Sequence, residues 1–77
     1  MHIEYLVGMA NDIGAFFSSE DTEALAASSI HAHLKRYWDP RMQAQIIAHY
    51  NGTGGEGLAG AVLDAVRLLA EDKAAKG

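Results

Sequence analysis

The sequence contains no cysteine and only one proline. The absence of cysteine excludes disulfide bonds and every metal or iron–sulfur site that thiolates would hold. Such cross-links often support very small domains, and 77 residues can form only one domain with a modest core. A metal ion held by imidazole groups, or a partner protein, remains as a source of additional stability.

Basic residues and long apolar runs are also scarce. The chain has 10 acidic and 6 basic side chains, and its formal net charge of −4 disfavours a general nucleic-acid binder, which needs a basic surface. No apolar run approaches the roughly 20 residues that cross a bilayer. The segment from Met1 to Glu4 lacks the basic start and apolar stretch of a signal peptide. We therefore expect a cytoplasmic protein that binds neither nucleic acid nor membrane.

The first part of the chain, from Ile3 to Phe17, has the apolar spacing of an amphipathic helix. One stripe is expected to face the core and consists of Ile3, Leu6, Val7, Ala10, Ile13 and Phe17. A second apolar stripe beside it consists of Tyr5, Met9 and Phe16. The remaining positions, assigned to solvent, are Glu4, Gly8, Asn11, Asp12, Ala15 and Ser18. This helix has more apolar surface than a small core can cover.

A second helix is predicted from about Glu20 to Tyr37. Residues 18–21 offer N-cap side chains and place acids in the first turn, where the helix dipole favours them. The apolar spacing predicts an inner stripe of Ala27, Ile30, Leu34 and Tyr37.

The single proline marks the sharpest boundary in the chain. Pro40 disfavours a helical conformation at Asp39, which can instead cap a third helix that has Pro40 at its first position. The apolar side of this helix is predicted to consist of Met42, Ile46, Ile47 and Tyr50. The glycine-rich segment 51–57 is expected to end it.

A fourth helix is predicted from about Leu58 to Glu71. The chain shows no alternating apolar pattern, no internal repeat and no linker, so the predicted fold class is all-α, a small compact bundle of about four helices. We expect a single helical domain over residues 1–72 and a frayed C-terminal tail over residues 73–77.

None of the residue patterns that accompany catalysis or cofactor binding is complete. His31 and His33 would point about 200° apart on a helix and cannot hold one metal ion together. Residues 52–57 match the spacing GxGxxG, but they follow a helix rather than a strand, and Glu56 would repel a phosphate. No serine has a base positioned beside it, and the paired acids lie at helix ends. We predict no catalytic residue, no metal site and no cofactor.

The junction at residues 35–42 is the best candidate for function, because it places three of the six basic residues around two aromatic rings. Trp38 there is either the anchor of the core or part of a docking surface. Arg41 lies in the first turn of a helix, where the dipole disfavours a cation, so an acidic neighbour or an acidic partner is expected to accept it. The predicted partner-binding residues are Tyr5, Met9, Phe16, Lys35, Arg36, Trp38, Arg41 and Met42.

Five short motifs in a fixed order give the chain a family resemblance. They are Met9-Ala10-Asn11, Phe16-Phe17, His33-Leu34, the run from Trp38 to Met42, and Gly57-Leu58. Over about residues 3–70 the sequence resembles the delta subunit of NAD-dependent molybdenum formate dehydrogenases. It departs from that pattern at Gln43, where a second arginine is frequent, at Gly60-Ala61, where a proline is frequent, and in an extra stretch at residues 51–53.

The resemblance implies a cytoplasmic complex in which a large subunit carries molybdopterin and iron–sulfur clusters, other subunits carry flavin and NAD, and the delta subunit carries no cofactor. It implies a non-catalytic accessory subunit that stabilises the complex or assists its assembly and maturation, with the molybdenum-containing catalytic subunit as its partner. Two alternatives stay open. One is a transient maturation chaperone for that catalytic subunit, and the other is a free-standing ligand- or metal-binding bundle that uses His31, His33 or His49. The isolated chain is also expected to dimerise or to bind hydrophobic dyes, and a homodimer would use the docking surface.

Overall fold

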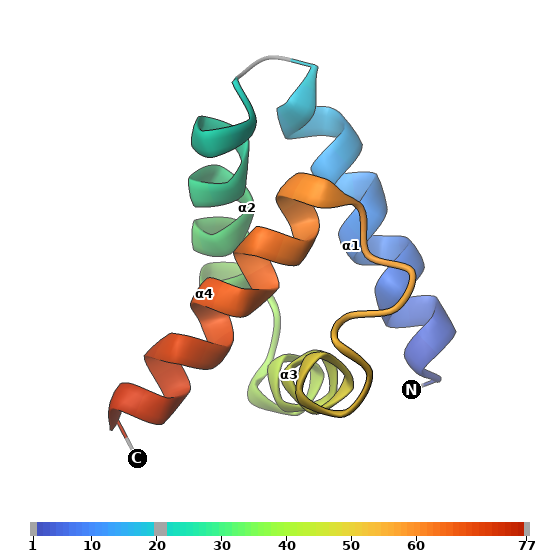
Figure 1. Cartoon of the computed structure of the whole chain (residues 1–77), viewed down its shortest axis with the longest axis vertical. Helices are drawn as coiled ribbons and strands as arrows, with labels where there is room; N and C mark the ends of the chain where they lie inside the picture. Colours follow the sequence, from blue (N-terminus) through green and yellow to red (C-terminus); the bar gives the residue numbers. More distant parts are fainter. Residues whose placement is uncertain (1, 20–21, 77) are drawn as a thin grey trace.

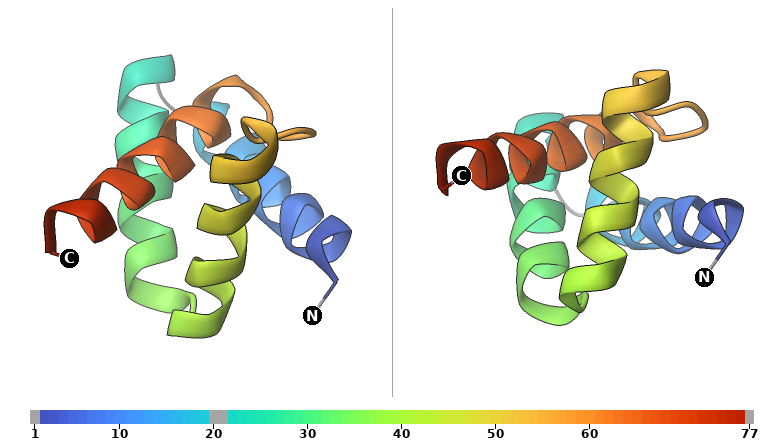
Figure 2. Two further views of the ribbon diagram at one scale, coloured as in Figure 1. Left: turned by 60° about the horizontal axis from the view of Figure 1, so that its bottom comes forward. Right: turned by 90° about the horizontal axis from the view of Figure 1, so that it is seen from below.

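The computed structural model describes residues 2–19 and 22–76 and shows four α-helices there and no strand. The predicted all-α bundle of about four helices is therefore confirmed (Figure 1). The helices are α1 (Ile3–Ser18), α2 (Glu23–Tyr37), α3 (Pro40–Thr53) and α4 (Gly60–Lys76). In the view of Figure 1, α4 crosses in front of α2 and begins beside α1, and α3 lies below them and is seen almost along its axis; Figure 2 shows α3 from the side.

The start of α2 differs from the prediction. Thr22 is its N-cap, and the Thr22 hydroxyl accepts a hydrogen bond from the Leu25 amide at 3.4 Å. Ser19, one of the predicted caps, instead closes α1, because its hydroxyl donates to the Phe16 carbonyl at 2.8 Å. The predicted helical start at Glu20 and the acids of the first turn lie outside the described residues.

The start of α3 confirms the prediction for the proline. The Asp39 carboxylate accepts from the Met42 amide at 3.0 Å, and Pro40 occupies the first turn, where its missing amide hydrogen costs nothing. The helix runs to Thr53, beyond the start of the predicted loop, and ends at Gly54 with a φ of 77°. This left-handed conformation suits glycine because a side chain would be strained there.

The core lies between all four helices, and its largest fully buried side chains are Leu6, Ile30, Leu34, Ile46, Val62 and Val66. Gly14 of α1 is part of it, because a Cβ atom there would collide with Val62 of α4. The apolar pattern did not identify Gly14, since a glycine carries no hydrophobic signal. Tyr37, predicted for the inner stripe of α2, is 66% exposed, so that assignment was wrong.

Asn11 connects α1 to the loop that follows α3. Its amide nitrogen donates to the Gly57 carbonyl at 2.9 Å, and its carbonyl oxygen accepts from the Ala59 amide at 3.1 Å. The loop is thereby held beside α1, as Figure 1 shows. Asn11 was assigned to solvent, and it is partly exposed, but the sequence did not predict its two hydrogen bonds to the backbone of a neighbouring segment.

A polar contact fixes the far end of α4 on α2. His31 donates from Nε2 to Asp72 Oδ2 at 2.6 Å, and Lys35 Nζ lies 3.3 Å from the same oxygen. These hydrogen bonds, from His31 first and Lys35 second, lower the pKa of the Asp72 carboxyl. The helix continues to Lys76, five residues beyond the predicted end at Glu71.

A candidate partner-docking face

Three large aromatic side chains are mostly exposed on α1 and α2: Tyr5 at 61%, Phe16 at 65% and Tyr37 at 66%. Such side chains are usually covered, either by a core or by another protein. The predicted second stripe of α1, formed by Tyr5, Met9 and Phe16, is therefore only partly covered: Met9 packs against the core, and the two aromatic residues lie in solvent.

A continuous row of rings crosses from α1 to α2. Phe16 and Phe17 meet edge to face with centroids 5.2 Å apart, and the Phe17 ring lies 6.1 Å from the His33 ring. His33 in turn lies 4.7 Å from Tyr37. We name Tyr5, Met9, Phe16, Phe17, His33 and Tyr37 together the aromatic face.

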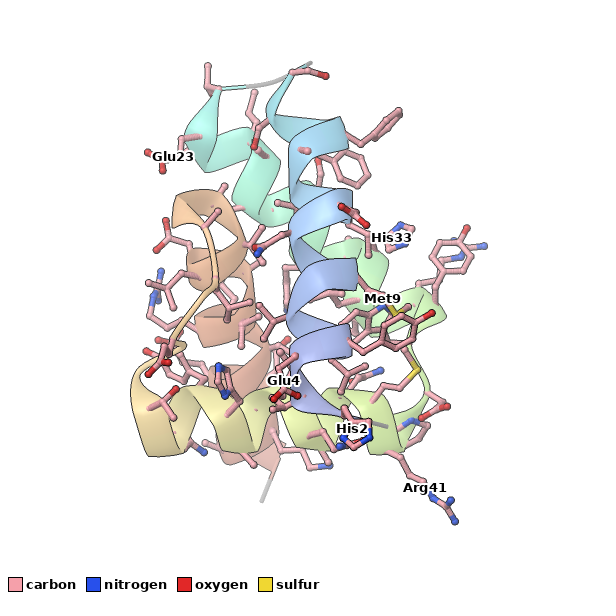
Figure 3. The ribbon with its side chains drawn as sticks, turned by 90° about the vertical axis from the view of Figure 1, so that its right-hand side faces the viewer. His2, Glu4, Met9, Glu23, His33 and Arg41 are labelled. Atoms are coloured by element: carbon pink, nitrogen blue, oxygen red, sulfur yellow. The ribbon has the colours of Figure 1, made fainter. Side chains whose placement is uncertain are left out.

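The aromatic face lies on the side of the molecule away from α4. In Figure 3, Met9, His33 and Arg41 project to one side of α1, and α4 lies on the other side. The surface is hollowed here, and the hollow is lined by Phe17, Ser29, Ala32, His33, Arg36 and Tyr37. The hollow is shallow and broadly open to solvent.

The corner between α2 and α3 divides into a structural part and an exposed part. Trp38 is 5% exposed and belongs to the core. Of the two roles that the sequence left open, core anchor and docking residue, this burial favours the core anchor. Gln43 holds the corner together, because its amide donates to the carbonyls of Trp38 at 2.7 Å and Leu34 at 3.3 Å. Met42 is half-buried against the core.

The three basic residues of this corner have different surroundings. Lys35 is held by Asp72, and the guanidinium of Arg36 lies 5.7 Å from the centre of the Tyr37 ring. Arg41 is exposed and forms no ion pair with any described residue. Figure 3 shows it projecting away from the helices. The sequence predicted that Arg41 binds either an acidic neighbour or an acidic partner. No acidic neighbour pairs with it among the described residues.

Sequence reasoning missed half of the aromatic face. Phe17 was assigned to the core stripe, and it does pack against the core. Tyr37 was assigned to the inner stripe, and His33 was interpreted as a separate surface or packing histidine. The spacing of His33 and Tyr37, four residues apart, does place both on one side of α2. That these two residues meet the end of α1 depends on helix packing, which the spacing alone does not determine.

The histidines take part in separate local contacts. His31 binds Asp72, His33 belongs to the aromatic face, and His49 Nε2 lies 2.7 Å from the Glu56 carbonyl. Within residues 2–19 and 22–76, no three His, Asp or Glu side chains are placed to hold a metal ion.

The glycine-rich loop is an internally bonded helix–helix connection. Thr53 Oγ1 accepts from the amides of Gly55 at 3.2 Å and Glu56 at 3.0 Å. These amides are the kind of donors that a phosphate-binding loop directs at its ligand, and here Thr53 occupies them. The match to GxGxxG therefore reflects turn geometry, since Gly54, Gly55 and Gly57 all have positive φ.

No helix in the described part of the chain is long and apolar enough to span a bilayer.

Comparison with known protein families gives a match over most of the chain. The sequence model of the family described as the NADH-dependent formate dehydrogenase delta subunit FdsD matches residues 5–66. The matched region runs from α1 into the first half of α4 and includes the aromatic face and the α2–α3 corner. No curated protein and no solved structure matches the chain.

Proposed function

This chain belongs to the family of NADH-dependent formate dehydrogenase delta subunits, and we propose that it is a non-catalytic accessory subunit of such an enzyme. In this role it stabilises the cytoplasmic complex or assists its assembly and maturation. The observation that supports a binding role is the aromatic face, whose exposed rings are unusual on a chain of 77 residues.

We propose that the aromatic face docks on the molybdenum-containing catalytic subunit. Tyr5, Met9, Phe16 and the half-buried Met42 would supply the apolar contact, and Arg36 and Arg41 would supply the charged contact. Aromatic and arginine side chains carry much of the energy in protein interfaces. Lys35 and Trp38 would contribute indirectly, because Trp38 packs the corner from inside and Lys35 fixes it to α4.

We propose that the subunit itself holds no cofactor and performs no chemistry. Its side chains include no thiolate for an iron–sulfur cluster, and the amides of its glycine-rich loop are engaged within the chain. The reactions of the complex would take place on other subunits.

The same aromatic face would also suit a transient chaperone of the catalytic subunit. The stoichiometry of the purified active enzyme separates the two roles. A permanent subunit is present once for each catalytic subunit, whereas a chaperone is absent from the fully loaded enzyme. Metal analysis of the purified chain tests the third role, a free-standing metal-binding bundle, which predicts a bound transition metal.

Arg41→Ala tests the docking surface directly. Because Arg41 makes no ion pair with the described residues, its loss should leave the helix content unchanged and weaken the complex mainly at low salt, where charged contacts are strongest. Affinity for the purified remaining complex is measured at two salt concentrations. The control is Lys73→Ala, an exposed cation on α4. Equal affinities of wild type and Arg41→Ala at low salt would exclude Arg41 from the interface.

A further inference from the structure

The outer side of α2 continues the aromatic face toward the start of that helix. Leu25, Ser29, Ala32 and Arg36 follow the spacing i, i+4, i+7 and i+11, so they lie on one side of α2, and we call them the α2 stripe. Three of them line the hollow together with three rings of the aromatic face. Leu25 is 58% exposed and adds an apolar side chain in the first turn of α2. The uncovered surface therefore extends along the whole length of this helix.

The dimensions of the α2 stripe match those of another helix. From Leu25 to Arg36 the stripe rises by about 16 Å, at 1.5 Å per residue, which is about three helical turns. The small side chains of Ser29 and Ala32 allow a second helix to come close, because packed helices lie about 8–10 Å apart according to the side chains between them. The hollow is shallow and broadly open, so it fits the side of an elongated element better than one inserted side chain.

The all-α fold also favours a helix over an extended segment. An extended segment gains its main-chain hydrogen bonds at the edge of a sheet, and the described part of the chain contains no strand. An amphipathic helix pairs its own backbone groups and docks through apolar side chains at positions i, i+3, i+4 and i+7. Such a helix needs only side-chain contacts, and these are what the α2 stripe and the rings offer.

The charges at one end of the α2 stripe indicate the charge of the partner. Arg36 ends the stripe, and Arg41 lies in the first turn of α3, just beyond the corner. Neither forms an ion pair with a described residue, although the chain has 10 acidic side chains. The Arg36 guanidinium lies 5.7 Å from the centre of the Tyr37 ring, so this charge is beside the aromatic face. A carboxylate of the partner would complete a charge-assisted pair there.

We propose that the partner contributes an amphipathic helix that lies along the α2 stripe. Its apolar side covers Leu25 and the rings of the aromatic face, and an acidic side chain at one end pairs with Arg36. This inference rests on the docking function proposed above, and it names the element of the partner that the aromatic face receives.

The spacing of cross-links tests the helix. Because the chain has no cysteine, Leu25→Cys and Ala32→Cys each provide one attachment point for a short cysteine-reactive photo-cross-linker. The two positions are seven residues apart on α2, which is about 10 Å. When each labelled chain is added to the purified remaining complex, mass spectrometry should identify partner residues about seven positions apart, as in a helix. Cross-links about three positions apart, as in an extended segment, or cross-links to two separate segments overturn the proposal.

Ala32→Glu tests the hollow and the charge together. The variant should fold, because Ala32 is exposed and glutamate also favours a helix, and circular dichroism checks this. It places a long anionic side chain where the acidic helix approaches, so it should weaken binding to the purified remaining complex at least about tenfold. The matched control is Ala24→Glu, also exposed on α2 but outside the α2 stripe, which should bind like the wild type. Wild-type affinity of Ala32→Glu, or equal weakening by the control, overturns the proposal.

The same measurements separate this inference from the docking function. If the wild-type chain does not bind the remaining complex, the docking function is wrong, and the helix along α2 is wrong with it. If Arg41→Ala weakens the complex whereas Ala32→Glu does not, the chain docks on the complex but not through a helix along the α2 stripe.

Discussion

At the scale of single residues, two neighbours at the end of α2 have opposite surroundings. Tyr37 is 66% exposed and Trp38 is 5% exposed, although the helical spacing had placed Tyr37 in the core. The helix ends at Tyr37, and Trp38 takes an extended conformation with a ψ of 134°, which lies outside the helical spacing. Trp38, the first residue after the helix, is therefore the one that packs into the core. Helical periodicity predicts which residues inside a helix face the core, but it does not predict the direction of the first residue after the helix.

The two neighbours should respond differently to truncation. Trp38→Ala removes a buried ring and should lower the free energy of unfolding by about 3–5 kcal/mol, a large part of the stability of so small a domain. Tyr37→Ala removes an exposed ring and should change the stability of a single chain by less than about 0.5 kcal/mol. Urea unfolding at low protein concentration measures both. Similar losses for the two variants would contradict the assignment of Trp38 to the core and Tyr37 to the surface.

At the scale of elements, the contact between α1 and α4 depends on a missing side chain. A Cβ atom at Gly14 would meet the γ-methyl group of Val62, which is itself buried, whereas a Cβ at Gly8 would meet nothing within 4 Å. Alanine favours a helix over glycine by about 1 kcal/mol at either position, but overpacking a core costs about 1–3 kcal/mol. The packing effect outweighs the helix propensity only at Gly14.

The two glycines therefore form a matched pair for mutation. Gly8→Ala should raise the free energy of unfolding by up to about 1 kcal/mol, and Gly14→Ala should lower it by up to about 2 kcal/mol. The sign of the change in urea midpoint is the measurement. A stabilised Gly14→Ala variant would show that α1 and α4 can separate without cost.

The contact between α2 and the end of α4 should make stability depend on pH. Hydrogen bonds from His31 and Lys35 lower the pKa of Asp72 below its ordinary value of 3.8. The contribution to stability is present above the ordinary value, where the carboxyl is charged in both the folded and unfolded chain. It is lost as the pH falls through the lowered value, because protonation then favours unfolding.

At neutral pH, the Asp72→Asn variant should therefore be less stable than the wild type. In acid, the two proteins should become nearly equal in stability. Thermal unfolding of wild type and variant is compared from neutral pH to below 3.8, and the difference in midpoint should shrink on the acid side. Glu56→Gln, which removes an exposed carboxyl outside the ion pairs of the described chain, corrects for the change in net charge. A difference that stays constant over the whole range would exclude this contact as its source.

The elements themselves could be predicted from the sequence, because their signals are local. Pro40 and Asp39 determine the start of α3 through backbone geometry, and the apolar spacing of α1 identifies Leu6 and Ala10 as core positions. The roles of Asn11 and Gly14 could not be predicted. Both depend on a segment more than 40 residues away, either the loop at Gly57 or Val62 of α4, and a single sequence does not show which segments meet.

At the scale of the whole molecule, the aromatic face was predictable only in part. The exposure of Tyr5 and Phe16 follows from an apolar arc that is too wide for a small core. The continuation through His33 and Tyr37 follows from the packing of α1 on α2, and the burial of Trp38 follows from the path of the corner. To predict a surface that two helices form together, one must know how the helices are placed relative to each other. To predict the core, it is enough to know which side of each helix is apolar.

The last prediction concerns the activity of the complete enzyme. A subunit outside the reaction path changes how many active sites exist but not the barrier at each of them, because binding stabilises the assembled state by mass action. Cells without this chain should contain less assembled, cofactor-loaded formate dehydrogenase, whereas NAD reduction per bound molybdenum should stay nearly unchanged. The purified chain alone should oxidise no formate. Formate-dependent NAD reduction is measured with and without the subunit and normalised to molybdenum content, and re-expression of the wild-type chain serves as the control. A large fall in the normalised rate would mean that the chain shapes the active site directly, and a purely structural role would then be wrong.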